Sequence, residues 1–200
     1  MRRTKEDAEQ TRLNLLEAAE QVFGKQGFAA TRLSDIATEA GVTRGAIYHH
    51  FGNKMELFVA LHKEKVDPYF KLLQDILDSD IAPKDRIRKM LTELLNRATH
   101  DIRFATRQRF DIFRDLEFLD TEEIHDFMHD RGEKFFYLIV KVIKKGQEIN
   151  DIRQDISAEL AALNLLAYIK GLVSLIVMEK HFDGILGHTE EMVDIVLKGF

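Results

Sequence analysis

The chain contains no cysteine and no tryptophan, and only two of its 200 residues are proline, Pro68 and Pro83. Without cysteine it can form neither disulfides nor thiolate metal sites, and a reducing compartment suits it. No glycine-, serine- or proline-rich linker interrupts the sequence, so two units would have to share helices or pack tightly. His125 and His129 have the i, i+4 spacing of a zinc pair but lack a third ligand. We therefore predict no metal site and no cofactor.

Catalytic motifs are also missing from the sequence. There is no phosphate-binding glycine-rich loop and no nucleophile elbow, which are the local signatures of two large groups of enzymes. The acidic residues instead follow helix starts and exposed helical faces. The sequence therefore predicts that the chain is not an enzyme.

Charge is spread unevenly along the chain. The formal net charge of −5 argues against a nucleic-acid coat protein that works by bulk charge. Residues 1–54 nevertheless contain eight Lys and Arg against seven Asp and Glu, whereas residues 55–200 contain 21 against 27. A weakly basic end on an acidic body would orient the protein as it approaches a polyanion.

Hydrophobic spacing predicts an all-α protein of about nine helices, because apolar residues recur at helical spacing and no stretch alternates as a strand does. Pro68 should kink or divide the fourth helix. The expected helices cover residues 7–26, two short helices within 33–54, and then 53–78, 83–100, 102–117, 121–147, 157–181 and 189–199.

The segment from Leu33 to Lys54 contains two short helical patterns joined by a tight turn. Gly41 ends the first pattern, where a residue without Cβ can take a positive φ. Thr43 is placed to cap the second helix with its side-chain oxygen. The residues of that helix expected to face inward are Ala46, Ile47 and Phe51. This arrangement is typical of a helix-turn-helix, whose second helix lies in a DNA major groove.

The outer face of the second helix suits DNA. Between Val42 and Lys54 there are two cations, two histidines and no carboxylate. Arginine pairs with phosphate or with guanine edges, and hydroxyls bond phosphate oxygens. Thr31 is expected to cap the helix that begins near Arg32 and to hold a phosphate. A phosphate would also balance the charge of Lys54 in the first turn of the helix that follows. The predicted DNA contacts are Thr31, Arg32, Thr43, Arg44, Gly45, Tyr48, His49, His50 and Lys54. The alternative is an ordinary surface helical hairpin.

Residues 12–58 resemble the DNA-binding region of the TetR family of one-component transcriptional repressors. The matching residues are Ala18, Ala19, Phe23, Gly27, Thr31, Asp35, Ile36, Ala37, Gly41, Val42, Gly45, Ala46, Ile47, Tyr48, His50, Phe51, Lys54, Leu57 and Phe58. The segments RRTKEDAEQTR and VTRGAIYHHFGNK are most similar to multidrug-efflux regulators of the AcrR type. The resemblance implies a cytoplasmic protein with a helix-turn-helix domain over residues 1–52 and a larger helical domain for effector binding and dimerisation over 53–200.

The apolar run from Leu160 to Met178 is long enough to span a membrane, but Asn164 and Lys170 lie near its middle. A helix that is apolar all round in a soluble protein is buried on several sides, so we expect it to face both its own chain and a second subunit. In the family, the last two long helices form a four-helix dimer interface. The predicted interface residues are Ala161, Ala162, Gly171, Ser174, Met192 and Val196. A monomer core is the alternative.

In the family, the middle helices enclose a pocket whose ligand changes the separation of the two DNA-binding ends. The residues that would line it are Ile87, Met90, Leu91, Leu94, Phe110, Asp111, Asp115, Phe135 and Leu166. Asp111 and Asp115 share a helical face and would suit an apolar cation, unless Arg107 and Arg114 make them a solvated ion-pair face.

The predicted function is therefore a ligand-responsive repressor. It would bind a palindromic operator as a homodimer, leave it when a small apolar effector binds, and control an efflux system. The alternative is a DNA-binding regulator without a small-molecule effector, controlled by a protein partner.

Overall fold

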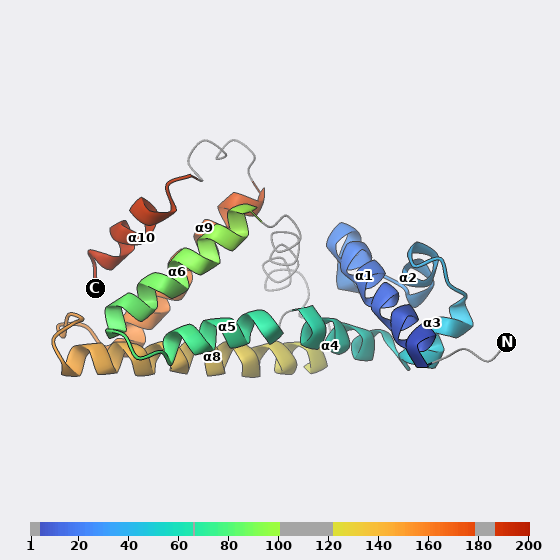
Figure 1. The fold of residues 1–200 in the computed structure, drawn as a ribbon, viewed down its shortest axis with the longest axis horizontal. Coiled ribbons are helices and arrows are strands. Elements are labelled where there is room, and N and C mark those ends of the chain that lie inside the picture. The colour runs from blue at the N-terminus through green and yellow to red at the C-terminus, as the bar shows by residue number, and fades with distance from the viewer. Residues whose placement is uncertain (1–4, 66, 101–121, 179–186) are drawn as a thin grey trace. The chain divides into compact units, whose positions relative to one another are not determined.

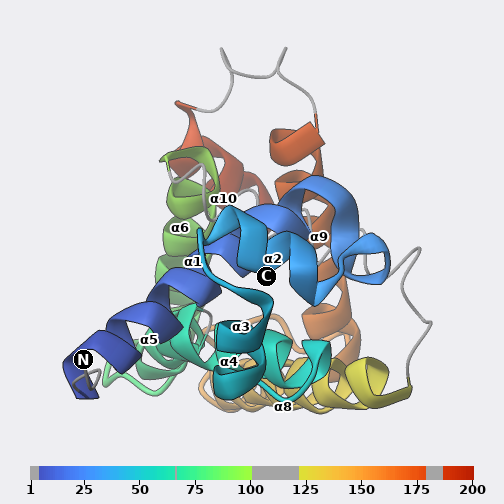
Figure 2. The ribbon, with the colours of Figure 1, turned by 90° about the vertical axis from the view of Figure 1, so that its right-hand side faces the viewer.

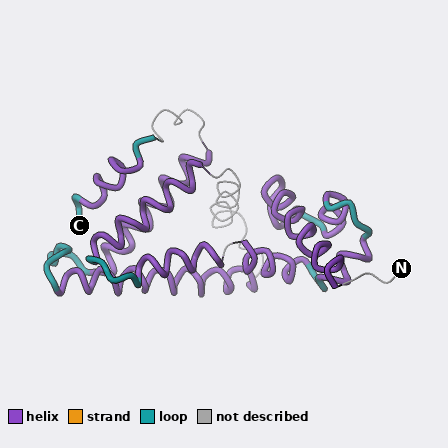
Figure 3. The backbone as a smooth tube through the Cα atoms, in the orientation of Figure 1, coloured by secondary structure: helices purple, strands orange, loops and turns teal. Residues whose placement is uncertain are grey.

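The computed structural model describes residues 5–65, 67–100, 122–178 and 187–200. Within these ranges every regular element is an α helix (Figures 1 and 3), which confirms the predicted fold class. The chain divides into two compact units, Met1–Phe70 and Lys71–Phe200, called here the N-terminal and C-terminal units. The functional boundary expected after residue 52 stays a prediction.

Four helices make up most of the N-terminal unit (Figure 2). They are α1 (Lys5–Ala30), α2 (Leu33–Glu39), α3 (Arg44–His50) and α4 (Lys54–Lys65). Helix α1 contacts both α2 and α4, and α2 contacts α3. The two short helices are therefore held by their neighbours, since isolated helices of seven residues are not stable in water.

Three phenylalanines form the centre of the N-terminal unit. The ring centroid of Phe28 lies 5.4 Å from that of Phe23 and 5.3 Å from that of Phe58, and the Phe23 and Phe58 centroids are 6.1 Å apart. All three side chains are buried, and Phe58 is fully inaccessible. Such tilted and edge-on pairs add to the free energy of burial, so this cluster fixes α1 against α4.

The junction between α1 and α2 differs from the sequence prediction. Gly27 has φ 78° and breaks α1 directly after residue 26, where the helix was expected to end, but a further helical turn continues to Ala30. The prediction that Thr31 caps α2 is wrong, because its buried hydroxyl donates to the Gly27 carbonyl at 2.6 Å. The cap residue is Arg32, whose backbone N–H donates to Asp35 Oδ2 at 2.9 Å. This hydrogen bond is the main cause that lowers the pKa of the Asp35 carboxyl.

The predicted helix over residues 53–78 is described as two elements on either side of residue 66, which lies outside the described residues. It consists of α4 and of α5 (Asp67–Leu77), with Pro68 in the first turn of α5, where its missing N–H has no helical partner to lose. The start of α4 is held by a pair of hydrogen bonds similar to a capping box, since the Glu56 N–H donates to Asn53 Oδ1 at 2.8 Å and the Glu56 carboxylate accepts from the Gly52 N–H at 3.0 Å.

The C-terminal unit contains longer helices. Beside α5 these are α6 (Pro83–His100), α8 (Glu122–Glu148), α9 (Ala158–Met178) and α10 (Thr189–Leu197). Helix α8 contacts α6 and α9, and α6 also contacts α9 and α10. The helix expected over residues 102–117 lies outside the described residues.

The end of α8 and the turn that follows it are closely packed. Gly146 is buried, and a Cβ there would lie 2.6 Å from Cδ1 of Ile152 and 3.1 Å from Cβ of Pro83. The Asp151 carboxylate accepts from the Lys84 N–H at 2.8 Å, which satisfies an unpaired donor at the start of α6. This turn therefore joins the end of α8 to the start of α6, and only glycine fits at residue 146 without displacement of a neighbour.

Helix α9 has two apolar faces. The face buried within the chain contains Ala158, Ala161, Ala162, Leu165, Ile169 and Val173. The opposite face, with Leu160, Leu163, Ala167, Gly171 and Leu175 around one polar residue, Asn164, is exposed in the single chain. In the described part of the chain, the segment Ala158–Ile176 is the one stretch long and apolar enough to cross a membrane, with a mean hydropathy of 1.6; a core or interface helix of a soluble protein has the same properties.

Candidate nucleic-acid interface

The turn between α2 and α3 is fixed by its backbone and by one side chain. Gly41 has φ 65°, a conformation that glycine adopts without a steric penalty. The Val42 N–H donates to the Ala37 carbonyl at 2.9 Å. The Ala46 N–H then donates to Thr43 Oγ1 at 3.2 Å, which confirms the predicted cap of α3. The angle between α2 and α3 therefore depends on Gly41 and Thr43, the two residues that the sequence analysis assigned to this turn.

Helix α3 separates an inner from an outer face as predicted. Ile47 and Phe51 are buried and Ala46 is half-buried. On the outer face, Arg44 and His49 are exposed and the side chain of Tyr48 is 46% exposed. The outer face is free to contact another molecule.

The outer face of α3 offers donors and no carboxylate. The Arg44 guanidinium lies 5.7 Å from the centroid of the Tyr48 ring, and this contact limits where the cation points. Gly45 is exposed, and a Cβ there would meet only Thr43 Oγ1, at 3.9 Å. A phosphate backbone can therefore approach the first turn of α3 closely. His50 is half-buried, with its ring centroid 6.4 Å from that of Phe51.

Lys54 does not have the environment expected of a phosphate contact. Its Nζ donates to the carbonyl oxygens of Phe28, Thr31 and Ala29, at 2.7, 2.9 and 3.2 Å. An ammonium group has three donors, so all of them are used inside the protein. Burial also lowers the pKa of Lys54 from its ordinary value, because desolvation disfavours the charged form. This geometry does not support the predicted phosphate contact.

Thr31 is also an internal residue. Besides donating to Gly27, its hydroxyl accepts from the Gln26 amide at 3.4 Å, and the same amide donates to Asp35 at 3.2 Å. Sequence reasoning missed this network. The sequence did contain a signal for it, because Asp35 lies three positions after Arg32, which is the spacing of a capping box. Arg32 remains exposed beside it.

The predicted effector residues lie in several places. Helix α6 contains four of them, all buried. Three are fully inaccessible, Ile87, Met90 and Leu91, and the fourth is Leu94. Phe135 on α8 and Leu166 on α9 are half-buried. The predicted positions Phe110, Asp111 and Asp115 lie outside the described residues.

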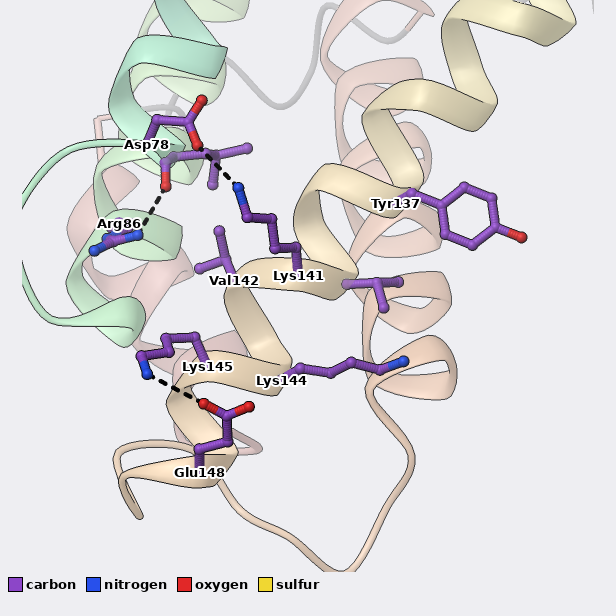
Figure 4. A pocket seen from close by; sticks show the side chains of 10 residues that line it. Asp78, Arg86, Tyr137, Lys141, Val142, Lys144, Lys145 and Glu148 are labelled. Atoms are coloured by element: carbon purple, nitrogen blue, oxygen red, sulfur yellow. Dashed lines mark hydrogen bonds and ion pairs between the residues drawn. The ribbon is translucent and has the colours of Figure 1, made fainter.

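A surface groove of about 470 Å³ lies elsewhere in the C-terminal unit (Figure 4). It is lined by Leu77, Asp78, Arg86, Tyr137, Val140, Lys141, Val142, Lys144, Lys145 and Glu148. None of these belongs to the predicted pocket. Two cations are paired across or beside the groove, Lys141 with Asp78 at 3.8 Å and Lys145 with Glu148 at 3.1 Å. Its four cations outnumber its two carboxylates, so the groove disfavours the cationic effector that the predicted aspartates would suit.

The predicted dimer residues do not share one face. Ala161 and Ala162 are buried by their own chain, so their side chains are not available to a second subunit. Gly171 is exposed, and Ser174, Met192 and Val196 are half-buried. Large apolar side chains that sequence reasoning did not select are more exposed, and these are Leu160, Leu163, Leu175 and Ile195.

Within the described ranges, no three His, Asp or Glu side chains lie close enough to hold a metal ion. His129 is exposed on α8. The side chain of its neighbour at i−4, His125, lies outside the described residues.

A capped pair of short helices, with an acid-free outer face on the second, defines a helix-turn-helix DNA-binding protein. The family model described as "Bacterial regulatory proteins, tetR family" matches residues 15–61. TtgR, an HTH-type transcriptional regulator of Pseudomonas putida, is 34% identical over 97% of this chain and 93% of its own length. The chain therefore belongs to the TetR family of bacterial transcriptional regulators and is not an enzyme. The predicted resemblance is confirmed.

Solved structures agree with this assignment. The structure of SmeT in complex with triclosan covers 94% of this chain and 90% of its own, with a TM-score of 0.80 and 22% identity. NalD, described as the secondary repressor of the MexAB-OprM multidrug efflux pump in Pseudomonas aeruginosa, has a TM-score of 0.72 and 27% identity, and the match covers 98% of both chains. The fold is thus shared along nearly the whole chain.

Proposed function

We propose that the protein is a cytoplasmic repressor that binds a palindromic operator as a dimer and is released by a small apolar effector. The observation that carries the DNA-binding part is the outer face of α3, which exposes Arg44, Tyr48 and His49 and has no carboxylate. The description of NalD as a repressor and the triclosan bound to SmeT support repression and effector binding by analogy.

In this proposal α3 is the recognition helix. Arg44 bonds a guanine edge, and the Tyr48 hydroxyl and Thr43 bond phosphates on either side of the groove. Gly45, His49, His50 and Arg32 are proposed as further contacts on the same DNA-facing surface. Thr31 and Lys54 take no part in direct contacts, because their polar groups bond within the N-terminal unit.

The base contact is tested by Arg44→Ala, measured as operator affinity for a set of single-base variants. We expect a loss of about 1–3 kcal/mol and a relaxed preference at one position. Lys25→Ala, which removes an exposed cation from α1, is the matched control and should leave the preference unchanged. Uniform weakening on all variants by Arg44→Ala would instead place this side chain on the DNA backbone.

Dimerisation is supported by the exposed stripe of α9. Leu160, Leu163 and Leu175 lie on one helical face together with Gly171, and exposed apolar patches of this kind mark protein interfaces. A twofold dimer would bring two recognition helices about 34–36 Å apart, or to a larger matched spacing, and so would select a palindrome.

The dimer is tested by Leu163→Glu, because a buried unpaired carboxylate is costly at an interface. Leu72→Glu is the matched control, since Leu72 is also an exposed leucine of the same unit but lies on α5. In analytical ultracentrifugation we expect Leu163→Glu to be monomeric at concentrations where the wild type and Leu72→Glu are dimers. A dimer that survives Leu163→Glu would exclude this face.

The effector would bind among the apolar residues of α6, α8 and α9, and an efflux system is the expected target. One observation favours the second candidate, a regulator controlled by a protein partner: Ile87, Met90 and Leu91 are fully inaccessible, so a ligand would have to displace packed side chains. Calorimetry with lipophilic cations, organic acids and triclosan, followed by operator titrations, separates the two. An effector must bind the released state more tightly, so equal operator affinity with and without every compound would favour the partner.

A further inference from the structure

The side chain of Lys54 joins two parts of the DNA-binding unit that are far apart in sequence. Its Nζ lies 2.7 Å from the Phe28 carbonyl oxygen, 3.2 Å from that of Ala29 and 2.9 Å from that of Thr31. It also lies 4.3 Å from the centroid of the Phe28 ring. We call these three oxygens the carbonyl cluster.

The carbonyl cluster is a place where a cation is needed. Phe28 and Ala29 lie in the short turn that follows the non-helical Gly27, and Thr31 comes directly after this turn. The Phe28 carbonyl also accepts from the Thr31 N–H at 3.2 Å. The converging carbonyl dipoles make this point negative, and the turn after Gly27 has no basic residue of its own. Lys54 supplies that charge from the first turn of α4, where an ammonium is otherwise poorly placed.

The joined segments determine where the recognition helix begins. Thr31 is two residues before Leu33, the first residue of α2, and α2 packs on α3. On the other side, Asn53 and Glu56 fix the first turn of α4 around Lys54. A displacement of the α4 start would therefore move the base of α2 through these three hydrogen bonds.

We propose that Lys54 is a positioning residue for operator recognition: it sets α2 and α3 relative to the start of α4 through the carbonyl cluster and does not itself contact DNA. The inference rests on the proposed operator binding and adds the residue that connects α4 to the recognition helix. It replaces the phosphate contact that sequence reasoning assigned to Lys54.

The salt dependence of operator binding distinguishes the two roles. A cation that neutralises one phosphate contributes about 0.9 to the slope of log K against log salt concentration. We expect Lys54→Met to weaken operator binding about tenfold or more, since hydrogen bonds to a charged group are lost, while the slope stays at the wild-type value. Hydrogen exchange should also become faster in Leu33–Glu39 while the middle of α1 keeps its wild-type rate. A slope reduced by about 0.9, or unchanged affinity, would overturn the proposal.

Lys54→Arg provides a second, independent test. A planar guanidinium cannot direct one nitrogen at three converging oxygens, but it bonds phosphate at least as well as an ammonium does. We expect Lys54→Arg to remain weakened, with faster exchange in α2, whereas restored wild-type affinity would mean that Lys54 contacts phosphate. This variant decides alone if Lys54→Met does not fold. Failure of the wild type itself to bind any operator would refute the proposed function instead, so the two failures are distinguishable.

Discussion

The two units of the chain hold their helices by different means. In the N-terminal unit, helices of seven residues are fixed by hydrogen bonds between side chains and backbone, such as those of Thr43, Asp35 and Lys54. In the C-terminal unit, α8 is 27 residues long, and its neighbours are packed through apolar faces. The ion pairs there, such as Lys144 with Glu159 at 2.7 Å, join exposed side chains and add little to stability.

This difference explains why one unit has a recognisable function and the other does not. Recognition of DNA requires a particular backbone geometry, and that geometry needs a specific residue at each turn. A packed helical body accepts many apolar residues of similar volume. Its sequence therefore specifies a fold without specifying a ligand.

The largest expected effect comes from Phe58→Ala. Phe58 is fully inaccessible and its ring packs on Phe28 at 5.3 Å, so we expect the N-terminal unit to lose about 3–5 kcal/mol of stability. Operator binding should fall with it. Hydrogen-exchange mass spectrometry in urea, which reports each unit separately, is the appropriate measurement.

Met90→Ala is the counterpart in the C-terminal unit, because Met90 is equally inaccessible and should cost about 2–5 kcal/mol there. The comparison between the units breaks down if either variant destabilises both units to the same extent. That result would mean that the chain unfolds as a single cooperative body.

Gly146→Ala should have the next largest effect. Its Cβ would lie 2.6 Å from Cδ1 of Ile152, and overpacking of this kind costs about 1–3 kcal/mol. Gly132→Ala, on the same helix, is the matched control, because a Cβ there meets nothing within 4 Å and alanine is favoured over glycine in a helix by about 0.5–1 kcal/mol. Urea unfolding of the C-terminal unit should therefore shift in opposite directions for the two variants. A stabilising Gly146→Ala would show that the end of α8 is loosely packed.

Much of the helical architecture is predictable, because helix ends depend on local residues. Pro68 lies in the first turn of α5, Gly41 takes a positive φ, and Ser157 accepts a hydrogen bond from the Leu160 N–H at 3.1 Å at the start of α9. Each of these effects operates within four residues along the chain.

The outer face of α3 was predictable for the same reason, since helical spacing decides which side chains point away from the core. The role of Lys54 was not, because its partners lie 23 to 26 residues earlier. The sequence shows only a cation in the first turn of a helix, where it is poorly placed. Either a DNA phosphate or carbonyl oxygens elsewhere in the chain could be its partner.

The faces of α9 were hard to assign from the sequence for another reason. Ala161 and Ala162 were assigned to the dimer from the resemblance to the family, but they are buried in their own chain. A helix that is apolar all round has no polar stripe to orient it. Its direction is therefore decided by tertiary packing, here against α6 and α8.

The smallest expected effect is a dependence of stability on pH, which tests whether Asp35 fixes the base of α2. The Arg32 N–H, which donates to this carboxylate, holds the pKa of Asp35 below its ordinary value of 3.8. A lowered pKa means that the unfolded chain binds the proton more tightly, so stability rises with pH across the interval between the two values. The contribution is therefore complete above the unfolded pKa and is lost as pH falls through the folded one.

Asp35→Asn should remove this component from the N-terminal unit when urea unfolding is followed from about pH 5 to about pH 2. Glu159→Gln is the matched control in the C-terminal unit, where a hydrogen bond from Lys144 is the main cause that lowers the pKa of Glu159. Each substitution should flatten the pH dependence of its own unit alone. If Asp35→Asn leaves the N-terminal unit as acid-sensitive as before, then the Arg32–Asp35 hydrogen bond does not hold the base of α2, and Lys54 would have to fix it unaided.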